Sequence, residues 1–267
     1  MALPPPDPGS TCLVTGASSG IGAEIARALA RRGHGVTLVA RREERLRELA
    51  TELSDSHGVR AETLGCDLAD EGARTRMLAR LSEFGLAVEV LVNNAGFGTS
   101  GPFVDIDQER EVEMVRLNVE AVVALCGRFV PEMVERGRGA VLNLASTAAF
   151  QPLPRNATYA ATKAFVLSFT DALHAEVKSS GVTATSLCPG PVKTEFVEVA
   201  GMDDAADVAP SFVWTRADFV AEEGVKGLEG GKRVVVPGKF NAAGALGGQH
   251  VPRSLLLRFA ERFSPTR

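Results

Sequence analysis

The stretch Thr15-Gly16-Ala17-Ser18-Ser19-Gly20-Ile21-Gly22 decides the fold of this chain. It directly follows the apolar, strand-like segment 12–14 and precedes a helical pattern over residues 22–32. Glycines at such a strand-to-helix turn let the backbone turn tightly and let its amides approach a pyrophosphate at the N-terminus of the helix. The spacing Gly-x-x-x-Gly-x-Gly therefore indicates a dinucleotide-binding turn, with a purely structural connector as the alternative.

Strand-like and helix-like segments alternate along most of the chain. Strands separated by helices predict a parallel sheet with helices on both faces. Right-handed crossovers then favour a doubly wound, Rossmann-type α/β fold with seven parallel strands in a single domain. The predicted strands are 12–14, 36–40, 59–67, 88–93, 140–145, 182–187 and 233–236, and the predicted helices are 22–32, 43–56, 71–84, 107–136 and 157–180.

The two ends of the chain lack this alternation. Residues 1–10 contain four prolines and predict a short flexible leader, so the main domain is expected at 11–237. Residues 238–267 form a C-terminal extension, in which 251–263 has the pattern of a basic amphipathic helix. The long stretch without a pattern is 190–215, and long loops at the carboxyl edge of a parallel sheet are usually functional.

The composition argues against several classes of protein. Hydrophobic residues make up 45% and charged residues 23%, as in ordinary globular proteins. A net charge of −4 and a pI near 5.7 argue against a nucleic-acid-binding surface. Four widely spaced cysteines without a Cys-x-x-Cys pair or signal peptide indicate reduced thiols in a cytoplasmic protein. No apolar run approaches the ~20 residues of a transmembrane helix, and scattered histidines give no support to a metal site.

Tyr159 is the only tyrosine, and it lies four residues before Lys163, so the phenol and the ammonium would share one face of a helix. An unperturbed phenol titrates near ~10. A cation about 4 Å away would favour the phenolate by roughly 4 kcal/mol at an effective dielectric constant of ~20. The pair therefore predicts a phenol with a lowered pKa, suited to proton exchange. A half-buried tyrosine beside a solvated lysine is the alternative when this pattern is taken alone.

Four ordered motifs lie within residues 11–237: the glycine turn, Asn93-Asn94-Ala95-Gly96, Tyr159 with Lys163, and Pro189-Gly190-Pro191-Val192-Lys193-Thr194. Together they resemble the motifs of the short-chain dehydrogenase/reductase family. Ser146 lies 13 residues before Tyr159, the separation usual in that family, and Asn118 lies in the long helix that carries its fourth catalytic residue. The resemblance implies an oxidoreductase that transfers a hydride between NAD(P)(H) and a carbonyl or secondary alcohol.

The resemblance also implies a catalytic set of Asn118, Ser146, Tyr159 and Lys163. Tyr159 would be the general acid in reduction and the general base in oxidation. Ser146 would stabilise the substrate oxygen, and Lys163 would lower the pKa of Tyr159 and hold the nicotinamide ribose. Asn118 would hold a water in a proton relay. Taken singly, Ser146 could instead be a turn hydroxyl and Asn118 a helix-bending amide.

Most residues expected to bind the cofactor lie in the four motifs, and the others stand at or just after the ends of the second and third predicted strands. Val192 and Thr194 would hold the nicotinamide carboxamide, and Asp67 would contact the adenine unless it caps the next helix. The full set is Gly16, Ser18, Ser19, Gly20, Ile21, Gly22, Arg41, Arg42, Asp67, Leu68, Asn94, Ala95, Gly96, Tyr159, Lys163, Pro189, Gly190, Val192 and Thr194.

The end of the second strand predicts NADP(H) rather than NAD(H). Ala40 stands where NAD users carry an acid that binds the ribose diol. Arg41 and Arg42 follow and can pair with a 2′-phosphate. The alternative is that both arginines begin a charged surface helix, where the two glutamates that come next could partly neutralise them. The family's other NADP signal, a basic residue before the middle glycine, is absent because Ser19 stands there.

By resemblance, the substrate pocket is built by the loop 190–215 with help from 97–103 and 148–155. Apolar side chains in these segments suggest a lipophilic ketone, alcohol or acyl chain, although apolar linings are common in pockets generally. They are Phe97, Phe103, Phe150, Leu153, Phe196, Val197, Val199, Met202, Phe212 and Trp214.

Three further expectations concern the C-terminal helix, the assembly of subunits and a competing function. The helix 251–263 could touch a membrane surface, but covering a pocket or a subunit interface is the favoured interpretation. Family members usually assemble through the helices that here carry Asn118 and Tyr159, so a homo-oligomer, either dimer or tetramer, is expected. The competing hypothesis for the whole chain is a redox sensor or scaffold that binds NADP(H) without turnover.

Overall fold

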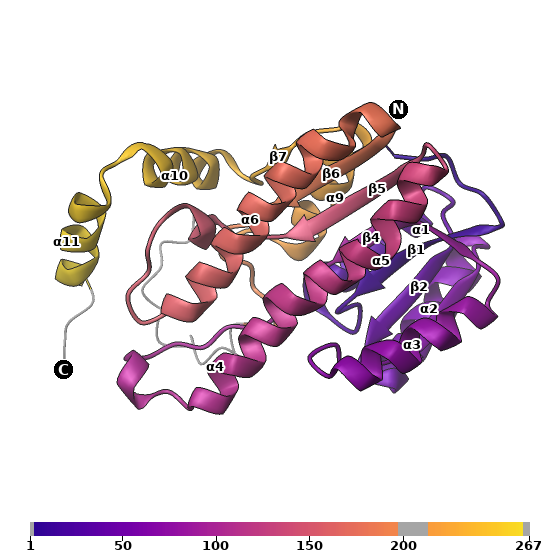
Figure 1. The fold of residues 1–267 in the computed structure, drawn as a ribbon, viewed down its shortest axis with the longest axis horizontal. Helices are drawn as coiled ribbons and strands as arrows, with labels where there is room; N and C mark the ends of the chain where they lie inside the picture. The colour runs from indigo at the N-terminus through magenta and orange to yellow at the C-terminus, as the bar shows by residue number, and fades with distance from the viewer. Residues whose placement is uncertain (1–2, 197–212, 264–267) are drawn as a thin grey trace.

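Seven parallel strands form the central sheet in the computed structural model, which describes residues 3–196 and 213–263 (Figure 1). The sheet order is β3-β2-β1-β4-β5-β6-β7, which confirms the predicted seven-stranded, doubly wound fold. From β1 the chain adds β2 and β3 on one side and then β4 to β7 on the other, so the strand order switches between β1 and β4. Ligands bind at such a switch point in folds of this kind. The strands are β1 (Ser10–Thr15), β2 (Val36–Ala40), β3 (Ala61–Gly65), β4 (Ala87–Asn93), β5 (Gly139–Leu144), β6 (Val182–Leu187) and β7 (Val234–Val235).

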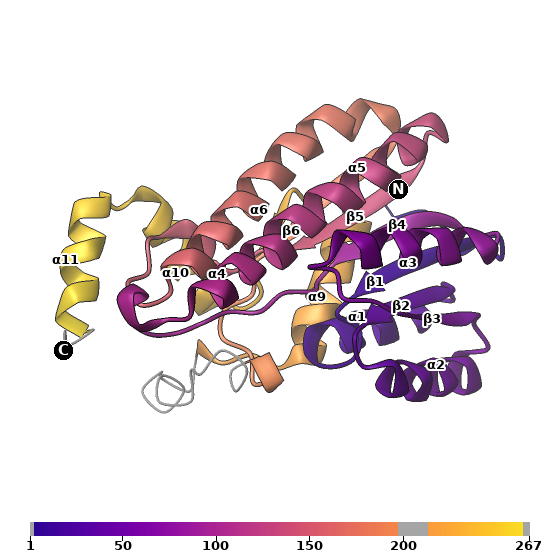
Figure 2. The same cartoon turned by 60° about the horizontal axis from the view of Figure 1, so that its bottom comes forward.

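Helices cover both faces of this sheet (Figure 2). One layer consists of α1 (Gly20–Ala30), α2 (Glu43–His57) and α9 (Ala217–Glu229), and the other of α3 (Glu71–Glu83), α5 (Ala121–Glu135) and α6 (Ala157–Val177).

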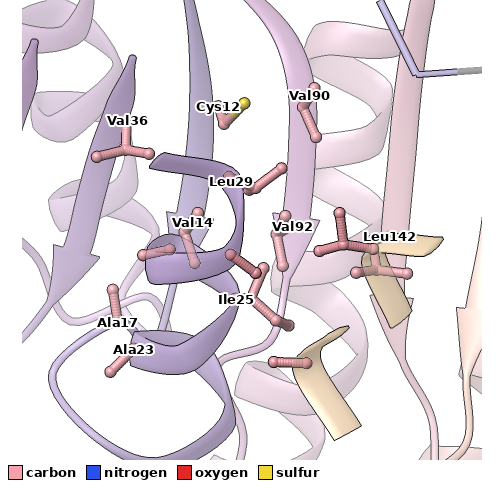
Figure 3. Close-up of a cluster of buried hydrophobic side chains, with 14 of the residues drawn as sticks. Cys12, Val14, Ala17, Ala23, Ile25, Leu29, Val36, Val90, Val92 and Leu142 are labelled. Atoms are coloured by element: carbon pink, nitrogen blue, oxygen red, sulfur yellow. The ribbon is translucent and has the colours of Figure 1, made fainter. Parts of the chain in front are cut away.

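Successive strand residues face opposite layers, so Leu13 and Val14 belong to different core clusters. Figure 3 shows Ile25 and Leu29 of α1, both fully buried, packed against Val14 and Val92 of the sheet. This packing fixes the start of α1, and with it the glycine turn, against the ends of β1 and β4.

The prediction of one uninterrupted helix at 107–136 is wrong in the middle of that range. The structure divides it into α4 (Gln108–Val115), a π-helical turn (Arg116–Glu120) and α5. A π-helical turn inserts an extra residue into the helical ladder and frequently marks a functional site. Asn118 lies in this turn with its side chain buried.

Two helices, α9 and α10 (Lys239–His250), are absent from the sequence prediction. Helix α9 packs against α1 through a buried stripe that includes Val220, Val225 and Leu228. Helix α10 forms although its segment is rich in glycine, and it lies against the short turn Thr147–Phe150. Helix α11 (Arg253–Phe263) falls within the range expected to be helical and extends away from the sheet (Figure 1).

Residues 3–9, expected as part of a leader, lie against the domain. Leu3 is buried in the core, and the Asp7 carboxylate pairs with Arg138 at 3.4 Å. β1 already begins at Ser10.

Within the described ranges, none of the helices combines the length and apolar character needed to cross a bilayer. In the same part of the chain no group of three or more His, Cys, Asp or Glu side chains could hold a metal ion. The four cysteines are buried and unpaired.

Candidate active site

A cleft of about 630 Å³ lies at the carboxyl ends of the central strands. It brings together nearly every predicted site residue, and only Gly22 and Asn118 lie behind its wall. The predicted residues that line it are Gly16, Ser18, Ser19, Gly20, Ile21, Arg41, Arg42, Asp67, Leu68, Asn94, Ala95, Gly96, Ser146, Tyr159, Lys163, Pro189, Gly190, Val192 and Thr194.

The glycine turn has the shape that a pyrophosphate requires. Gly16 and Gly20 have φ angles of +66° and +57°, in the left-handed region that favours glycine. Ser19 precedes α1 but makes no side-chain capping bond, so its hydroxyl leaves the first-turn amides of the helix available as donors. Donors at a helix N-terminus bind anions. These residues therefore fit the diphosphate of a dinucleotide.

Asn94 holds this turn in place from the end of β4. Its Nδ2 donates to the carbonyl oxygens of Thr15 and Gly16, at 2.9 and 3.2 Å. The hydroxyl of Thr15 accepts from the backbone N–H groups of Asn94 and Ala95, at 2.9 and 3.0 Å. A Cβ at Gly22 would lie 2.4 Å from Asn94 Nδ2, so Gly22 serves close packing behind the cleft. Thr15 is absent from the predicted set, and its only signal is its place directly before the glycines.

Ser146, Tyr159 and Lys163 meet at the other end of the cleft. The Ser146 hydroxyl accepts from the Ala148 N–H at 3.1 Å and is also hydrogen-bonded to the Tyr159 hydroxyl. Lys163 is buried, and its Nζ donates to the Leu144 carbonyl oxygen at 2.8 Å. The same Nζ lies 5.8 Å from the centre of the Tyr159 ring. Ser146 is thus both a turn hydroxyl and a partner of the tyrosine.

Burial raises the pKa of Tyr159, and the hydrogen bond with Ser146 offsets part of that rise. Burial lowers the pKa of Lys163 to about 8. Burial and Ser146 thus set the direction of the Tyr159 pKa, and the expected lowering by Lys163 stays a prediction. Removal from water disfavours the charged form of each group, and the Lys163 ammonium donates its hydrogen bond to the Leu144 carbonyl oxygen.

Asn118 joins two walls of this end of the cleft. Its Oδ1 accepts from the Phe97 N–H at 3.1 Å, and its Nδ2 donates to the Phe97 carbonyl at 2.9 Å and to the Thr162 hydroxyl at 3.2 Å. A Cβ at Gly96 would lie 2.8 Å from Asn118 Oδ1 and 3.5 Å from Lys163 Nζ, so only glycine leaves room here. The Asn118 side chain thus connects the end of β4 to α6.

Arg42 is the centre of the ionic contacts at the glycine-turn end. Its guanidinium donates to the Ser18 hydroxyl at 3.1 Å, to the Ser19 hydroxyl at 2.8 Å and to Glu195 at 2.7 Å. Arg45 donates to the same Glu195 carboxylate at 2.5 Å. Arg45 and Glu195 are absent from the predicted set, and only their closeness in sequence to Arg42 and Thr194 could have indicated them.

The other charges at this end are arranged differently from expectation. Glu43 pairs with Arg47 at 2.6 Å, so it does not neutralise the arginines before it. Asp67 accepts from the Ala69 N–H at 3.0 Å, whereas Asp70 caps α3. The alternative that Asp67 is the helix cap is therefore wrong, and Asp67 lines the cleft.

The apolar residues expected around the substrate divide into three groups. Phe97, Leu153, Phe196 and Trp214 line the cleft, and the Phe196 ring lies 5.6 Å from that of Tyr159. Phe103 is 59% exposed and Phe150 packs against the core, so neither lines it. The remaining four, Val197, Val199, Met202 and Phe212, lie outside the described residues.

Comparison with known proteins decides the family. A family model described as short chain dehydrogenase matches residues 10–204. The chain belongs to the short-chain dehydrogenase/reductase family. Membership confirms the predicted family and reaction class, an oxidoreductase.

This short-chain dehydrogenase/reductase is similar to relatives whose names give different activities. It is 36% identical over 200 residues to the very-long-chain 3-oxoacyl-CoA reductase of Anas platyrhynchos, covering 73% of this chain but only 64% of the relative. It is 40% identical over 200 residues to sulfoacetaldehyde reductase 2 of Chromohalobacter salexigens, covering 74% and 79%. A short-chain dehydrogenase from Sphingobium yanoikuyae, solved in complex with NADPH, superposes with a TM-score of 0.80 at 34% identity over 97% and 96% of the two chains.

Proposed function

We propose that this protein transfers a hydride between NADP(H) and a carbonyl or secondary-alcohol substrate, with Tyr159 as the general acid and base. One observation carries this proposal. Ser146, Tyr159 and Lys163 meet at one end of the cleft whose other end holds the glycine turn and Arg42. A dinucleotide along this cleft would carry its reactive ring toward the hydroxyl groups.

The side chains of the cleft would handle the proton and orient the substrate. When bound, the nicotinamide would supply or accept the hydride. Ser146 and Tyr159 would share the substrate oxygen, with Tyr159 donating its proton in reduction and taking it back in oxidation. The raised pKa of Tyr159 keeps the phenol protonated, which suits carbonyl reduction. Lys163, with a pKa of about 8, can exchange a proton near neutral pH, and Asn118 would fix the wall around it.

NADP(H) is the proposed cofactor because the end of β2 offers cations and no carboxylate. Ala40, Arg41 and Arg42 all line the cleft, and Arg42 already contacts the hydroxyls of the glycine turn. A guanidinium suits a 2′-phosphate through its paired donors. The test is kcat/KM with NADPH against NADH for one substrate. A clear preference for NADH would overturn the choice of cofactor.

The proposed substrate is lipophilic. The two relatives are named for a very-long-chain acyl thioester and for a small sulfonated aldehyde, so their names point in different directions. Phe97, Leu153, Phe196 and Trp214 give the described part of the cleft an apolar side, which favours the first kind. A panel of ketones of increasing chain length, run beside sulfonated aldehydes, tests this. Faster turnover of the sulfonated compounds would contradict it.

We further propose a homo-oligomer that works in the cytoplasm, with residues 11–237 as the catalytic domain and 190–215 as its substrate loop. Val123 and Val134 of α5 and Phe165 of α6 are exposed, which supports contact between subunits there, and sedimentation would test it.

Four unpaired cysteines fit a reducing compartment. In the extension 238–267, α10 lies against Thr147–Phe150, which supports a cover for the pocket over membrane contact through 251–263.

A redox sensor or scaffold without turnover is not favoured, because the acid–base residues remain together beside the cofactor cleft. The same panel separates the two functions. NADPH binding without turnover of any ketone or alcohol would favour the scaffold.

A further inference from the structure

Glu195 joins two walls of the cofactor cleft. It follows Thr194 in the segment after β6, whereas its partners Arg42 and Arg45 stand at the start of α2. One carboxylate oxygen accepts from Arg42 at 2.7 Å and the other from Arg45 at 2.5 Å. Because Arg45 lies three residues after Arg42, the two guanidinium groups converge on a single anion.

The same arginines are the natural ligands of a phosphate monoester. Arg42 donates to Ser18 and Ser19 of the glycine turn, so its guanidinium already lies where the adenosine end of the cofactor is expected. A carboxylate and a phosphate seek the same paired N–H donors. The Glu195 carboxylate and a phosphate therefore cannot both accept from the same N–H groups of Arg42 and Arg45.

Relative strength decides which anion prevails. The side chains of Arg42, Arg45 and Glu195 are 45%, 46% and 39% exposed, so solvent screens their pairs and each pair contributes little stability. Hydrogen bonds from Arg45 and Arg42 still hold the pKa of Glu195 at about 2, so the carboxylate is charged at neutral pH. A phosphate carries up to about two charges and more acceptor oxygens, and it would displace the carboxylate.

We infer that Glu195 competes with the 2′-phosphate of NADP(H) for Arg42 and Arg45, and that Arg45 is a further ligand of that phosphate. This inference rests on the proposed NADP(H)-dependent function. NAD(H) has no phosphate at this place and leaves both Glu195 pairs intact. Glu195 therefore weakens NADP(H) binding selectively, and Arg45 strengthens it selectively.

The first test is Glu195→Gln, which removes the charge and keeps the shape. Trp214 is the only tryptophan and lines the cleft, so quenching of its fluorescence reports the Kd of each nucleotide. We expect the Kd of NADPH to fall about three- to tenfold, the effect of one or two exposed ion pairs, and that of NADH to stay within about twofold. Weaker binding of both nucleotides would mean that Glu195 clasps the cofactor, and it would overturn the inference, as would unchanged values.

The second test is Arg45→Gln, with Arg47→Gln as the matched control on the same helix. Arg47 pairs with Glu43 instead, so its loss should leave both Kd values unchanged. Arg45→Gln should raise the Kd of NADPH about three- to tenfold and spare NADH. An unchanged NADPH affinity in Arg45→Gln would overturn the inference while leaving the proposed function intact. A wild-type protein that binds no NADPH would overturn both.

Discussion

At one end of the cleft Lys163 is buried to 6% exposure beside Tyr159, whereas at the other end Arg42 and Arg45 lie nearly half exposed around Glu195. Burial raises the pKa of Tyr159 and lowers that of Lys163, so it favours the neutral form of each group. Hydrogen bonds from Arg45 and Arg42 lower the pKa of Glu195, so they favour the charged carboxylate.

The difference teaches that one cleft can use ionisable groups in two ways. Desolvation prevails where side chains are packed, so the groups there suit proton transfer. Pairing prevails where solvent reaches the charges, so the groups there suit exchange of one anion for another. Changes at the buried end should therefore alter rates and pH profiles, and changes at the exposed end should alter affinities.

The largest expected effect is at the buried end. Tyr159→Phe removes the hydroxyl of the only tyrosine, which is the proposed proton donor. The variant should lower kcat by about 10²–10⁴-fold, the usual contribution of a positioned proton donor. Steady-state kinetics with the best ketone of the panel measures this.

The matched readout for Tyr159→Phe is the Kd of NADPH, which should stay within about twofold because the glycine turn and arginines are untouched. Unchanged turnover would contradict the assigned role of Tyr159. A large loss of NADPH affinity would show that the two ends are not separable.

Gly16→Ala should damage the turn that both ends share. An added Cβ would lie 2.6 Å from Asn94 Nδ2 and 2.9 Å from Ala95 Cα, in a backbone conformation with φ of +66°. We expect a loss of roughly 2–4 kcal/mol in unfolding free energy from strain and crowding, together with loss of NADPH binding. Urea unfolding and Trp214 quenching measure the two effects.

Gly58→Ala is the control for Gly16→Ala, because Gly58 has the same φ of +66° but no atom within 4 Å of the added Cβ. It should cost only about 1–2 kcal/mol of backbone strain and leave NADPH binding unchanged. Equal losses in the two variants would show that crowding against Asn94 contributes nothing.

The sequence was sufficient to predict the sheet, the glycine turn and the pair Tyr159 and Lys163 in the cleft. The glycine turn and the alternating strands depend on local pattern, and Tyr159 and Lys163 share a helix, so their proximity follows from spacing. Helix α10 could not be predicted because its glycines disfavour a helix until it packs against Thr147–Phe150.

Contacts between distant segments were beyond the sequence. The pairing of Glu195 with Arg42 and Arg45 spans the cleft, so no local pattern encodes it. The direction of the Tyr159 pKa depends on how far the fold removes the phenol from water. The π-helical turn at Asn118 likewise has no apolar period of its own.

A smaller effect tests whether desolvation governs Lys163. Its folded pKa of about 8 lies below the ordinary value of 10.5, so above about pH 8 the unfolded chain keeps a proton that the folded protein has released. Stability from this group therefore increases with pH in that window and is lost as the pH falls through 8. In Lys163→Met, the stability relative to wild type should fall by roughly 1–3 kcal/mol between about pH 8 and 10.

Urea unfolding across that pH range measures the difference between Lys163→Met and wild type. The Cys126 thiol, whose pKa burial raises to about 12, lowers stability with rising pH in both proteins, so its contribution cancels in the comparison. Parallel stability curves would show that Lys163 titrates as an ordinary lysine.

The smallest expected effect is a shift in the titration of Tyr159, which the sole tyrosine makes directly visible through tyrosinate absorbance. Without nucleotide, its midpoint should lie above the ordinary ~10, because burial outweighs the hydrogen bond with Ser146. Ser146→Ala removes that bond and should raise the midpoint further. Ser146→Thr keeps a hydroxyl and should stay close to wild type. A midpoint below ~10 in the wild-type protein would mean that the attraction of Lys163 prevails over desolvation, and the contrast between the two ends of the cleft would then disappear.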